Sequence, residues 1–320
     1  MKTEFYSNGK LLITGEYAVL DGAESLAIPT IYGQSLGLKQ IEEPLLAWRS
    51  LDEKGNVWFQ GVFELETLAL SPKESDYSFS TASSYNDTVS EEKIAIATTL
   101  SNILKEARNL NPDFLAQQQG YEVTTSLNFP RNWGLGTSST LINNIASWAN
   151  VNAYSLLWNS FSGSGYDIAC AQHHSPITYK LTDNKPQVKQ VSFNPSYKNS
   201  LYFVYLNQKQ NSREGIAAYK SKDFNKIGLL SKINNFTQRV LTASSLSQFE
   251  KLLKKHEEAI SEVLEITPIK ERLFPDFKGA IKSLGAWGGD FILVTGNKNT
   301  PDYFKNKGYS IVIPYSKMVK

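Results

Sequence analysis

The sequence contains few of the residues on which several common kinds of site depend. Its 320 residues include one cysteine, Cys170, which excludes a disulfide within the chain and favours a reducing compartment. The three histidines, His173, His174 and His256, do not have the spacing of zinc ligands. A metal held by protein nitrogen or sulfur is therefore not expected.

The chain also lacks an excess of charge and a long apolar run. The formal net charge is +2 and no cluster of Lys and Arg is interleaved with aromatic residues, so nucleic acid is not an expected partner. No stretch approaches the about 18 apolar residues of a membrane helix, and the first ten residues lack the apolar core of a signal peptide. We expect a cytoplasmic globular protein that binds a small molecule, and the sequence leaves a homodimer open.

Acidic residues are absent from Val123 to Tyr166, and this segment contains a glycine turn. Residues 130–142 read PRNWGLGTSSTLI, in which Gly134 and Gly136 let the backbone approach a ligand. Alternation over residues 121–129 predicts a strand before the turn, and helical apolar spacing follows it. Because the first turn of a helix has free N–H groups, the segment favours a phosphate site with nothing nearby to repel an anion. A plain turn and helix cap also fits these residues.

Strand and helix patterns occur in both halves of the chain, which predicts an α+β protein of two domains. A polar segment with two prolines, residues 185–199, is the candidate linker, so we assign residues 1–190 to an N-terminal domain and residues 191–320 to a C-terminal domain. The expected strands are 11–20 and 25–38, joined by a hairpin turn at Asp21-Gly22, then 57–70, 177–181, 201–206, 291–295 and 309–313. The expected helices are 91–110, 212–222, 229–241, 246–265 and one ending within 279–284, and residues 71–90 are expected to form a loop.

Four separated segments resemble, in the same order, the motifs of the GHMP kinases, the superfamily of galactokinase, homoserine, mevalonate and phosphomevalonate kinases. They read NGKLLITGEYAVLDG at 8–22, PRNWGLGTSST at 130–140, GSGYDIA at 163–169 and KSLGAWGGDF at 282–291. The resemblance implies an N-terminal domain like domain 2 of ribosomal protein S5 and a ferredoxin-like C-terminal domain. It also implies ATP and a small-molecule acceptor bound between them.

Within the superfamily, the motifs are most similar to those of phosphomevalonate kinases. Gly-Glu-Tyr-Ala-Val-Leu at 15–20 has Tyr17 where mevalonate kinases usually have His, and Gly-Gly-Asp occurs at 288–290. Residues 165–169 also carry the Gly-Tyr-Asp-Ile-Ala signature of one group of these kinases. The implied reaction is phosphorylation of phosphomevalonate or mevalonate in the synthesis of isoprenoid precursors.

The resemblance assigns roles to residues in the first three motifs. Asp167 matches the catalytic base, and Lys10 matches the lysine that pairs with it, although a structural salt bridge would explain the pair as well. Ser138 matches the serine that coordinates Mg²⁺, whose preference is for oxygen ligands. The residues expected to bind the ATP phosphates are Gly134, Leu135, Gly136, Thr137, Ser138 and Ser139.

Predicted acceptor contacts lie in three other places. Glu16 and Tyr17 follow the first motif strand, although a tyrosine packed at a turn is an equal alternative. Ser212, with Lys209 and Arg213 beside it, stands where relatives have a loop that reaches the active site. The remaining predicted contacts are the glycines of the last motif, Gly285, Gly288 and Gly289.

Two departures from the family pattern bear on activity. Trp287 replaces a glycine of the last motif, and we expect its ring to narrow the pocket or to stack on a ligand. The glutamate that binds metal in mevalonate kinases has no counterpart between the phosphate turn and Asp167. Two alternatives therefore stay open: a GHMP kinase for another alcohol, such as a sugar or a homoserine-like compound, and an inactive ligand-binding regulator with this fold.

Overall fold

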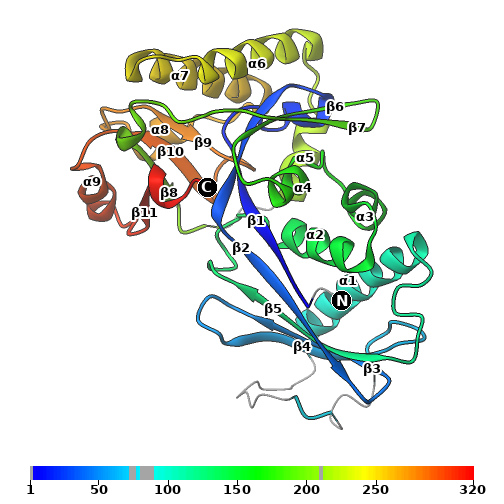
Figure 1. The fold of residues 1–320 in the computed structure, drawn as a ribbon. Helices are drawn as coiled ribbons and strands as arrows, with labels where there is room; N and C mark the ends of the chain where they lie inside the picture. The colour runs from blue at the N-terminus through cyan, green and yellow to red at the C-terminus, as the bar shows by residue number, and fades with distance from the viewer. Residues whose placement is uncertain (1–2, 72–76, 80–89, 209–211) are drawn as a thin grey trace. The chain divides into compact units, whose positions relative to one another are not determined.

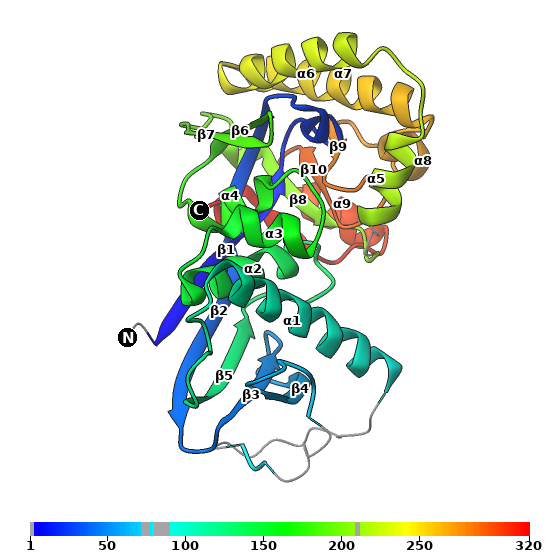
Figure 2. The ribbon, with the colours of Figure 1, turned by 90° about the vertical axis from the view of Figure 1, so that its right-hand side faces the viewer.

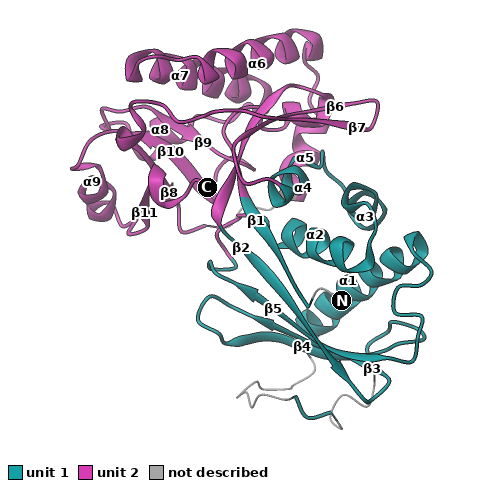
Figure 3. Cartoon of the chain, viewed as in Figure 1, with its two compact units in different colours: residues 1–9, 32–131, 136–172 teal, residues 10–31, 132–135, 173–320 magenta. Residues whose placement is uncertain are grey.

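The computed structural model describes residues 3–71, 77–79, 90–208 and 212–320. It is a mixed α+β structure, which confirms the predicted fold class, and its chain passes back and forth between two units (Figures 1 and 3). Unit 1 comprises residues 1–9, 32–131 and 136–172, and unit 2 comprises 10–31, 132–135 and 173–320. The boundary between residues 190 and 191 stays a prediction.

Unit 1 is a sheet covered on one face by helices. β3 (Leu45–Leu51) pairs antiparallel with β4 (Val57–Glu64) and parallel with β5 (Gly120–Leu127), and β5 pairs antiparallel with residues 34–41 of β2 (Ser25–Ile41). β1 (Glu4–Leu12) pairs with β2. Figure 2 shows the helices of this unit on one face of its sheet. Alternate residues of the strands, such as Trp48, Phe59 and Val123, form one apolar core with these helices. The helices of this unit are α1 (Glu91–Leu110), α2 (Thr137–Ala149), α3 (Ala153–Ser160) and α4 (Tyr166–Gln172).

Unit 2 contains the second sheet, whose strands pair antiparallel in the order β11-β8-β10-β9. Along the chain, β8 precedes a helical segment, β9 and β10 follow, and α9 leads to β11, which is the ferredoxin-like arrangement expected from the motifs. The strands are β8 (Leu201–Tyr205), β9 (Ile281–Ser283), β10 (Phe291–Thr295) and β11 (Val312–Pro314). The helices are α5 (Ser212–Lys220), α6 (Lys226–Leu241), α7 (Leu246–Leu264), α8 (Ile269–Leu273) and α9 (Thr300–Asn306).

Unit 2 also contains the first half of β2, the strands β6 and β7, and short 3-10 helices. Residues 25–27 of β2 pair antiparallel with β6 (Ile177–Thr182), and β6 pairs with β7 (Lys185–Gln190). Short 3-10 helices η1 (Ala18–Asp21), η3 (Lys198–Ser200) and η4 (Tyr315–Lys317) complete the unit. In the part of the chain with described positions, no helix has both the length and the apolar character to cross a bilayer.

Long elements with strong local signals confirm the sequence predictions. The helix predicted at residues 91–110 is α1, whose N-cap Ser90 accepts a hydrogen bond from the backbone N–H of Lys93. α7 begins after Ser245, which caps the helix in the same way. The strand predicted at residues 291–295 is β10. Each of these segments combines periodicity with a cap or with flanking turn residues, so local sequence defines it well.

The strands predicted at 57–70 and 309–313 are shorter, since β4 ends at Glu64 and β11 begins at Val312. Three other predictions named the wrong kind of element. Residues 13–20 leave the strand and form η1, and Gly22 (φ 91°) ends that helix in place of a two-residue hairpin. The predicted linker forms β7 over residues 185–190, where Pro186 is tolerated because β7 is an edge strand. The segment 279–284 contains β9 and not the end of a helix. Most of the loop predicted at 71–90 lies outside the described residues.

Candidate active site

The turn at residues 134–136, which the sequence predicts as a phosphate site, has the backbone geometry of an open helix N-terminus. Gly134 (φ 66°) and Gly136 (φ 95°) are both left-handed, and Gly136 is the N-cap of α2. No side chain in the described structure caps this helix, and the Oγ atom of Ser139 donates to the carbonyl of Gly136 at 2.9 Å. Ser138 is exposed in the first turn. The plain-cap alternative therefore loses its support, because neither Thr137 nor Ser138 caps α2.

Lys10 reaches this turn from β1. Its Nζ donates to the carbonyl oxygen of Gly134 at 2.9 Å, and its backbone N–H donates to the carbonyl of Leu135 at 3.0 Å. The two contacts fix both the main chain and the ammonium group of Lys10 beside the turn. An ammonium at this place favours an anionic ligand.

An acidic residue that the sequence analysis did not assign lies at the same turn. A Cβ atom built on Gly134 would come within 3.0 Å of the carboxyl group of Asp290. The expectation that nothing near the turn repels an anion is therefore wrong. It considered only residues near the turn in sequence, whereas Asp290 arrives from the loop before β10. The Gly-Gly-Asp sequence of the last motif, which ends at Asp290, was the one sequence feature that could have indicated this contact.

Asp167 and Ser138 lie on helices that pack together within unit 1. Asp167 is half-buried in the first turn of α4, which follows a glycine turn and packs against α2. The side-chain amide of Gln172 at the end of α4 donates to Asn143 of α2 at 3.0 Å. This bond fixes the helix of the predicted base to the helix of the predicted metal ligand. Lys10 belongs to unit 2, so its pairing with Asp167 stays a prediction.

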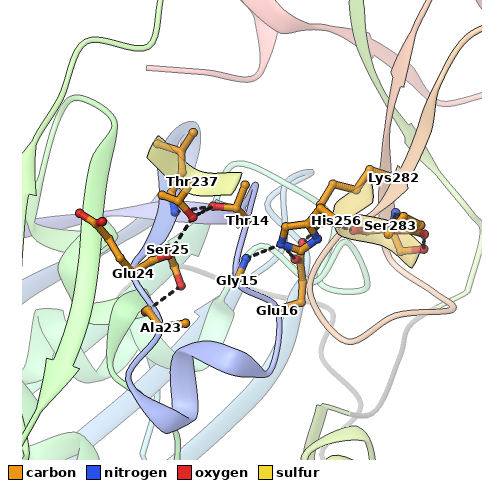
Figure 4. A network of polar contacts seen from close by, with 12 residues as sticks. Thr14, Gly15, Glu16, Ala23, Glu24, Ser25, Thr237, His256, Lys282 and Ser283 are labelled. Carbon is orange, nitrogen blue, oxygen red and sulfur yellow. Dashed lines mark hydrogen bonds and ion pairs between the residues drawn. The ribbon is translucent and has the colours of Figure 1, made fainter. Parts of the chain in front are cut away.

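Glu16 belongs to a buried ionic cluster of unit 2 (Figure 4). Its carboxylate pairs with the ammonium of Lys282 in β9, and both side chains are fully buried. His256 of α7 accepts a hydrogen bond from the backbone N–H of Gly15 at 2.9 Å through Nε2. On the same helix, Glu257 accepts from the hydroxyl of Ser283 at 2.7 Å. We refer to Glu16, His256, Glu257, Lys282 and Ser283 as the ionic cluster.

Burial controls the protonation of the ionic cluster. It raises the pKa of the Glu16 carboxyl, although the adjacent Lys282 opposes the shift. It also raises the pKa of Glu257 to about 7, against the opposing effects of Lys282 and Ser283. The pKa of His256 lies well below its usual value because of burial and the charge of Lys282, so His256 is neutral. Glu16 is thus paired inside the protein, and its role toward an acceptor stays a prediction.

Tyr17 and Trp287 are buried together in an apolar cluster. The Tyr17 hydroxyl donates to the carbonyl of Ala286 at 2.8 Å, and burial raises its pKa to about 12. Trp287 is 3% exposed and packs among residues of η1, α6 and α7, including Ala18, Leu229 and Ile260. The expectation that its ring stacks on a ligand is wrong, because the indole has no exposed face.

The other predicted acceptor contacts lie on two segments of unit 2. Gly285 (φ 64°) and Gly288 (φ 102°) are left-handed in the turn between β9 and β10, with open space where a Cβ would be, and Gly289 is buried beside them. Ser212 is the first residue of α5, and Lys209 lies outside the described residues. Their roles toward an acceptor stay predictions. Nowhere in the described parts of the chain do three His, Cys, Asp or Glu side chains gather as metal ligands.

The fold is that of the GHMP kinases: unit 1 has a sheet covered by helices, and unit 2 has a ferredoxin-like order of elements. Comparison with solved structures confirms this fold. No protein-family model and no curated protein matches the sequence. Methanococcus jannaschii mevalonate kinase aligns with a TM-score of 0.66 at 15% identity over 98% of this chain and 96% of its own.

Two further solved structures match over similar lengths. Streptococcus pneumoniae phosphomevalonate kinase, in complex with phosphomevalonate and AMPPNP, gives a TM-score of 0.66 at 16% identity over 96% of both chains. Lactococcus lactis galactokinase, complexed with galactose, gives 0.64 at 15% identity over 96% of this chain and 88% of its own. These TM-scores show a shared fold, while the three proteins are kinases named for different acceptors.

Proposed function

We propose that the protein is an ATP-dependent kinase of the GHMP type that transfers the γ-phosphoryl group to a small-molecule alcohol or phosphate. The observation that carries the proposal is the uncapped N-terminus of α2 behind Gly134 and Gly136, with the ammonium of Lys10 bound to Gly134. Backbone N–H groups and a helix N-terminus suit a polyphosphate. Phosphoryl transfer depends mainly on placement and on neutralised charge, which is what these residues can supply.

The residues at the turn fit Mg²⁺ together with a nucleotide. Ser138 is an exposed residue in the first turn of α2, and no acid lies in that turn. One hydroxyl and the phosphate oxygens are acceptable ligands for Mg²⁺, which keeps several waters. When bound, the ion would neutralise charge on the phosphates. The carboxylate of Asp290 at Gly134 makes this neutralisation more important, because it adds a negative charge beside the turn.

Asp167 and Lys10 would act on the acceptor. The Asp167 carboxylate would accept the proton of an attacking hydroxyl, and the Lys10 ammonium would stabilise the negative charge that develops on the transferred group. If the acceptor is itself a phosphate, no strong base is needed, and Asp167 would orient it.

For the acceptor, we propose phosphomevalonate or mevalonate, with the reaction serving isoprenoid precursor synthesis in the cytoplasm. The support is the Gly-Glu-Tyr-Ala-Val-Leu and Gly-Gly-Asp motifs and the structural similarity to a mevalonate and a phosphomevalonate kinase. A GHMP kinase for another alcohol is the alternative, since a galactokinase matches as well.

A coupled assay of ADP release tests the proposal directly. Purified protein with ATP and Mg²⁺ would be supplied with phosphomevalonate, mevalonate, galactose or homoserine in separate reactions. We expect turnover with one of the first two compounds. Turnover with galactose or homoserine alone would reject the proposed acceptors and retain the proposed kinase activity. ATP binding without turnover on any acceptor would support the alternative of an inactive ligand-binding regulator.

A further inference from the structure

We infer that Tyr17 is a positioning residue, which sets helix α5 against the 285–290 loop and thereby shapes the acceptor site. The inference rests on the proposed function, because the predicted acceptor contacts Ser212 and Gly288 lie on these two segments. Tyr17 is buried and contacts both of them through one hydroxyl group.

The backbone at Tyr17 adopts a strained turn. Tyr17 has φ 59° and ψ −47°, and the N–H of Ala18 donates to the carbonyl of Glu16 at 2.6 Å. A γ-turn with positive φ is rare for a residue with a side chain, and such outliers persist only where the surrounding structure holds them. The turn directs the Tyr17 hydroxyl to the carbonyl of Ala286, which lies in the 285–290 loop.

Helix α5 lies against the same hydroxyl. A Cβ atom built on Gly215 would come within 3.0 Å of the Tyr17 hydroxyl oxygen, and the next nearest atoms are Cζ and Cε1 of the ring at 3.2 and 3.3 Å. Glycine weakens a helix relative to alanine, so its presence here serves the close approach. The hydroxyl oxygen is the principal obstacle to a side chain at this position.

A second contact fixes α5 one turn further along. The ring of Tyr219 stacks on Tyr17 with centroids 5.4 Å apart and an interplanar angle of 18°. The Tyr219 hydroxyl donates to Asp21 at 2.7 Å, and Asp21 also pairs with Lys226 at 2.8 Å. Because Tyr219 anchors this part of α5, displacement at Gly215 would mainly move the first turn of the helix, which begins at Ser212.

Three segments with predicted roles therefore meet at the Tyr17 hydroxyl. They are the turn that follows β1, the loop that carries Asp290 to Gly134, and the first turn of α5. A change at the hydroxyl alters the spacing between α5 and the loop. Acceptor binding should respond to this spacing more strongly than ATP binding, which depends on the Gly134–Gly136 turn.

The test is a double-mutant cycle of Gly215→Ala and Tyr17→Phe, with Tyr303→Phe as a remote control. Gly215→Ala should raise KM for the acceptor about tenfold and change KM for ATP by less than about twofold. Tyr17→Phe removes the obstructing oxygen, so adding Gly215→Ala to it should raise the acceptor KM by less than about threefold. Additive effects, or an unchanged acceptor KM in Gly215→Ala, would overturn the inference.

Thermal unfolding tests this inference independently of the proposed function, because a Tm measurement requires no enzymatic activity. Gly215→Ala should lower Tm in the native background and raise it in the Tyr17→Phe background, where only the ring contacts of 3.2 and 3.3 Å remain and a small shift of the ring lets alanine strengthen the helix. A raised Tm in both backgrounds overturns the contact. If the native protein shows no phosphoryl transfer, the proposed function fails, and the reversal of the Tm shift still tests the contact.

Discussion

The Gly134–Gly136 turn and the ionic cluster use polar groups in opposite ways. At the turn, the first N–H groups of α2 have no side-chain cap in the described structure, and Ser138 is exposed. In the ionic cluster, Glu16 and Lys282 are fully buried and bind each other, and Glu257 accepts from Ser283. Both regions carry residues of the motifs that resemble those of the GHMP kinases, so a motif match alone does not distinguish a ligand contact from a structural one.

The difference gives each region a distinct role. Backbone donors without an internal partner can bind an external anion. A buried ion pair is costly to break, because the remaining charge is left in an apolar environment. Removal of a charged side chain at the turn should therefore change activity with little loss of stability, and removal of one in the ionic cluster should do the reverse.

Lys10→Met should have the largest effect. We expect the rate of phosphoryl transfer to fall about a thousandfold, equivalent to about 4 kcal/mol, because the ammonium at Gly134 is lost. The free energy of unfolding should change little, since Lys10 is only half-buried. Lys307→Met, which removes an exposed pair with Asp276, is the matched control. Single-turnover kinetics with urea unfolding would check this, and an unaffected rate would remove Lys10 from the mechanism.

Lys282→Met tests the ionic cluster and should mainly reduce stability. Removal of the ammonium leaves the Glu16 carboxyl buried without its ion pair, and we expect a loss of about 3 kcal/mol in the free energy of unfolding. Adding Glu16→Gln should restore part of this loss, since the buried charge is then absent. Urea denaturation of the three variants would measure it. If Lys282→Met alone were as stable as the native protein, the structural role of the Glu16–Lys282 pair would be contradicted.

Gly136→Ala is expected to have a smaller, mixed effect. A side chain at φ 95° should cost about 1–2 kcal/mol of stability and raise KM for ATP about tenfold, because the turn that precedes α2 is distorted. Gly55→Ala is the control, with φ 81° and open space around it, far from the motifs in sequence. It should lose similar stability at unchanged KM for ATP. Equal KM values in both variants would argue against a phosphate site at Gly136.

Glu257→Gln should change the pH dependence of stability. The pKa of Glu257 is raised from about 4.5 to about 7, so its contribution is complete below pH 4.5 and declines as pH rises through 7. The native protein should therefore lose stability relative to the variant as the pH rises from about 4.5 to about 7, and the difference should level off above pH 7. Thermal melts at several pH values would measure the difference, and parallel curves for the two proteins would show that Glu257 does not titrate there.

Local sequence predicted the long elements and the phosphate turn because their signals lie within a few residues. The cap at Ser90 and the periodicity after it define α1, and the glycines define the turn before α2. Contacts between distant residues were not predictable in this way. Asp290 reaches Gly134, and Lys282 pairs with Glu16, only after the chain has folded. The burial of Trp287 was missed for the same reason.

The most direct test of the central claim is transfer of labelled phosphate from γ-labelled ATP to phosphomevalonate or mevalonate, comparing the native protein with Asp167→Asn. We expect Mg²⁺-dependent labelling of one acceptor by the native protein. The variant should bind ATP with similar affinity and label the acceptor at least about a hundredfold more slowly. Equal rates for the two proteins, or no labelling by a native protein that binds ATP, would contradict the account.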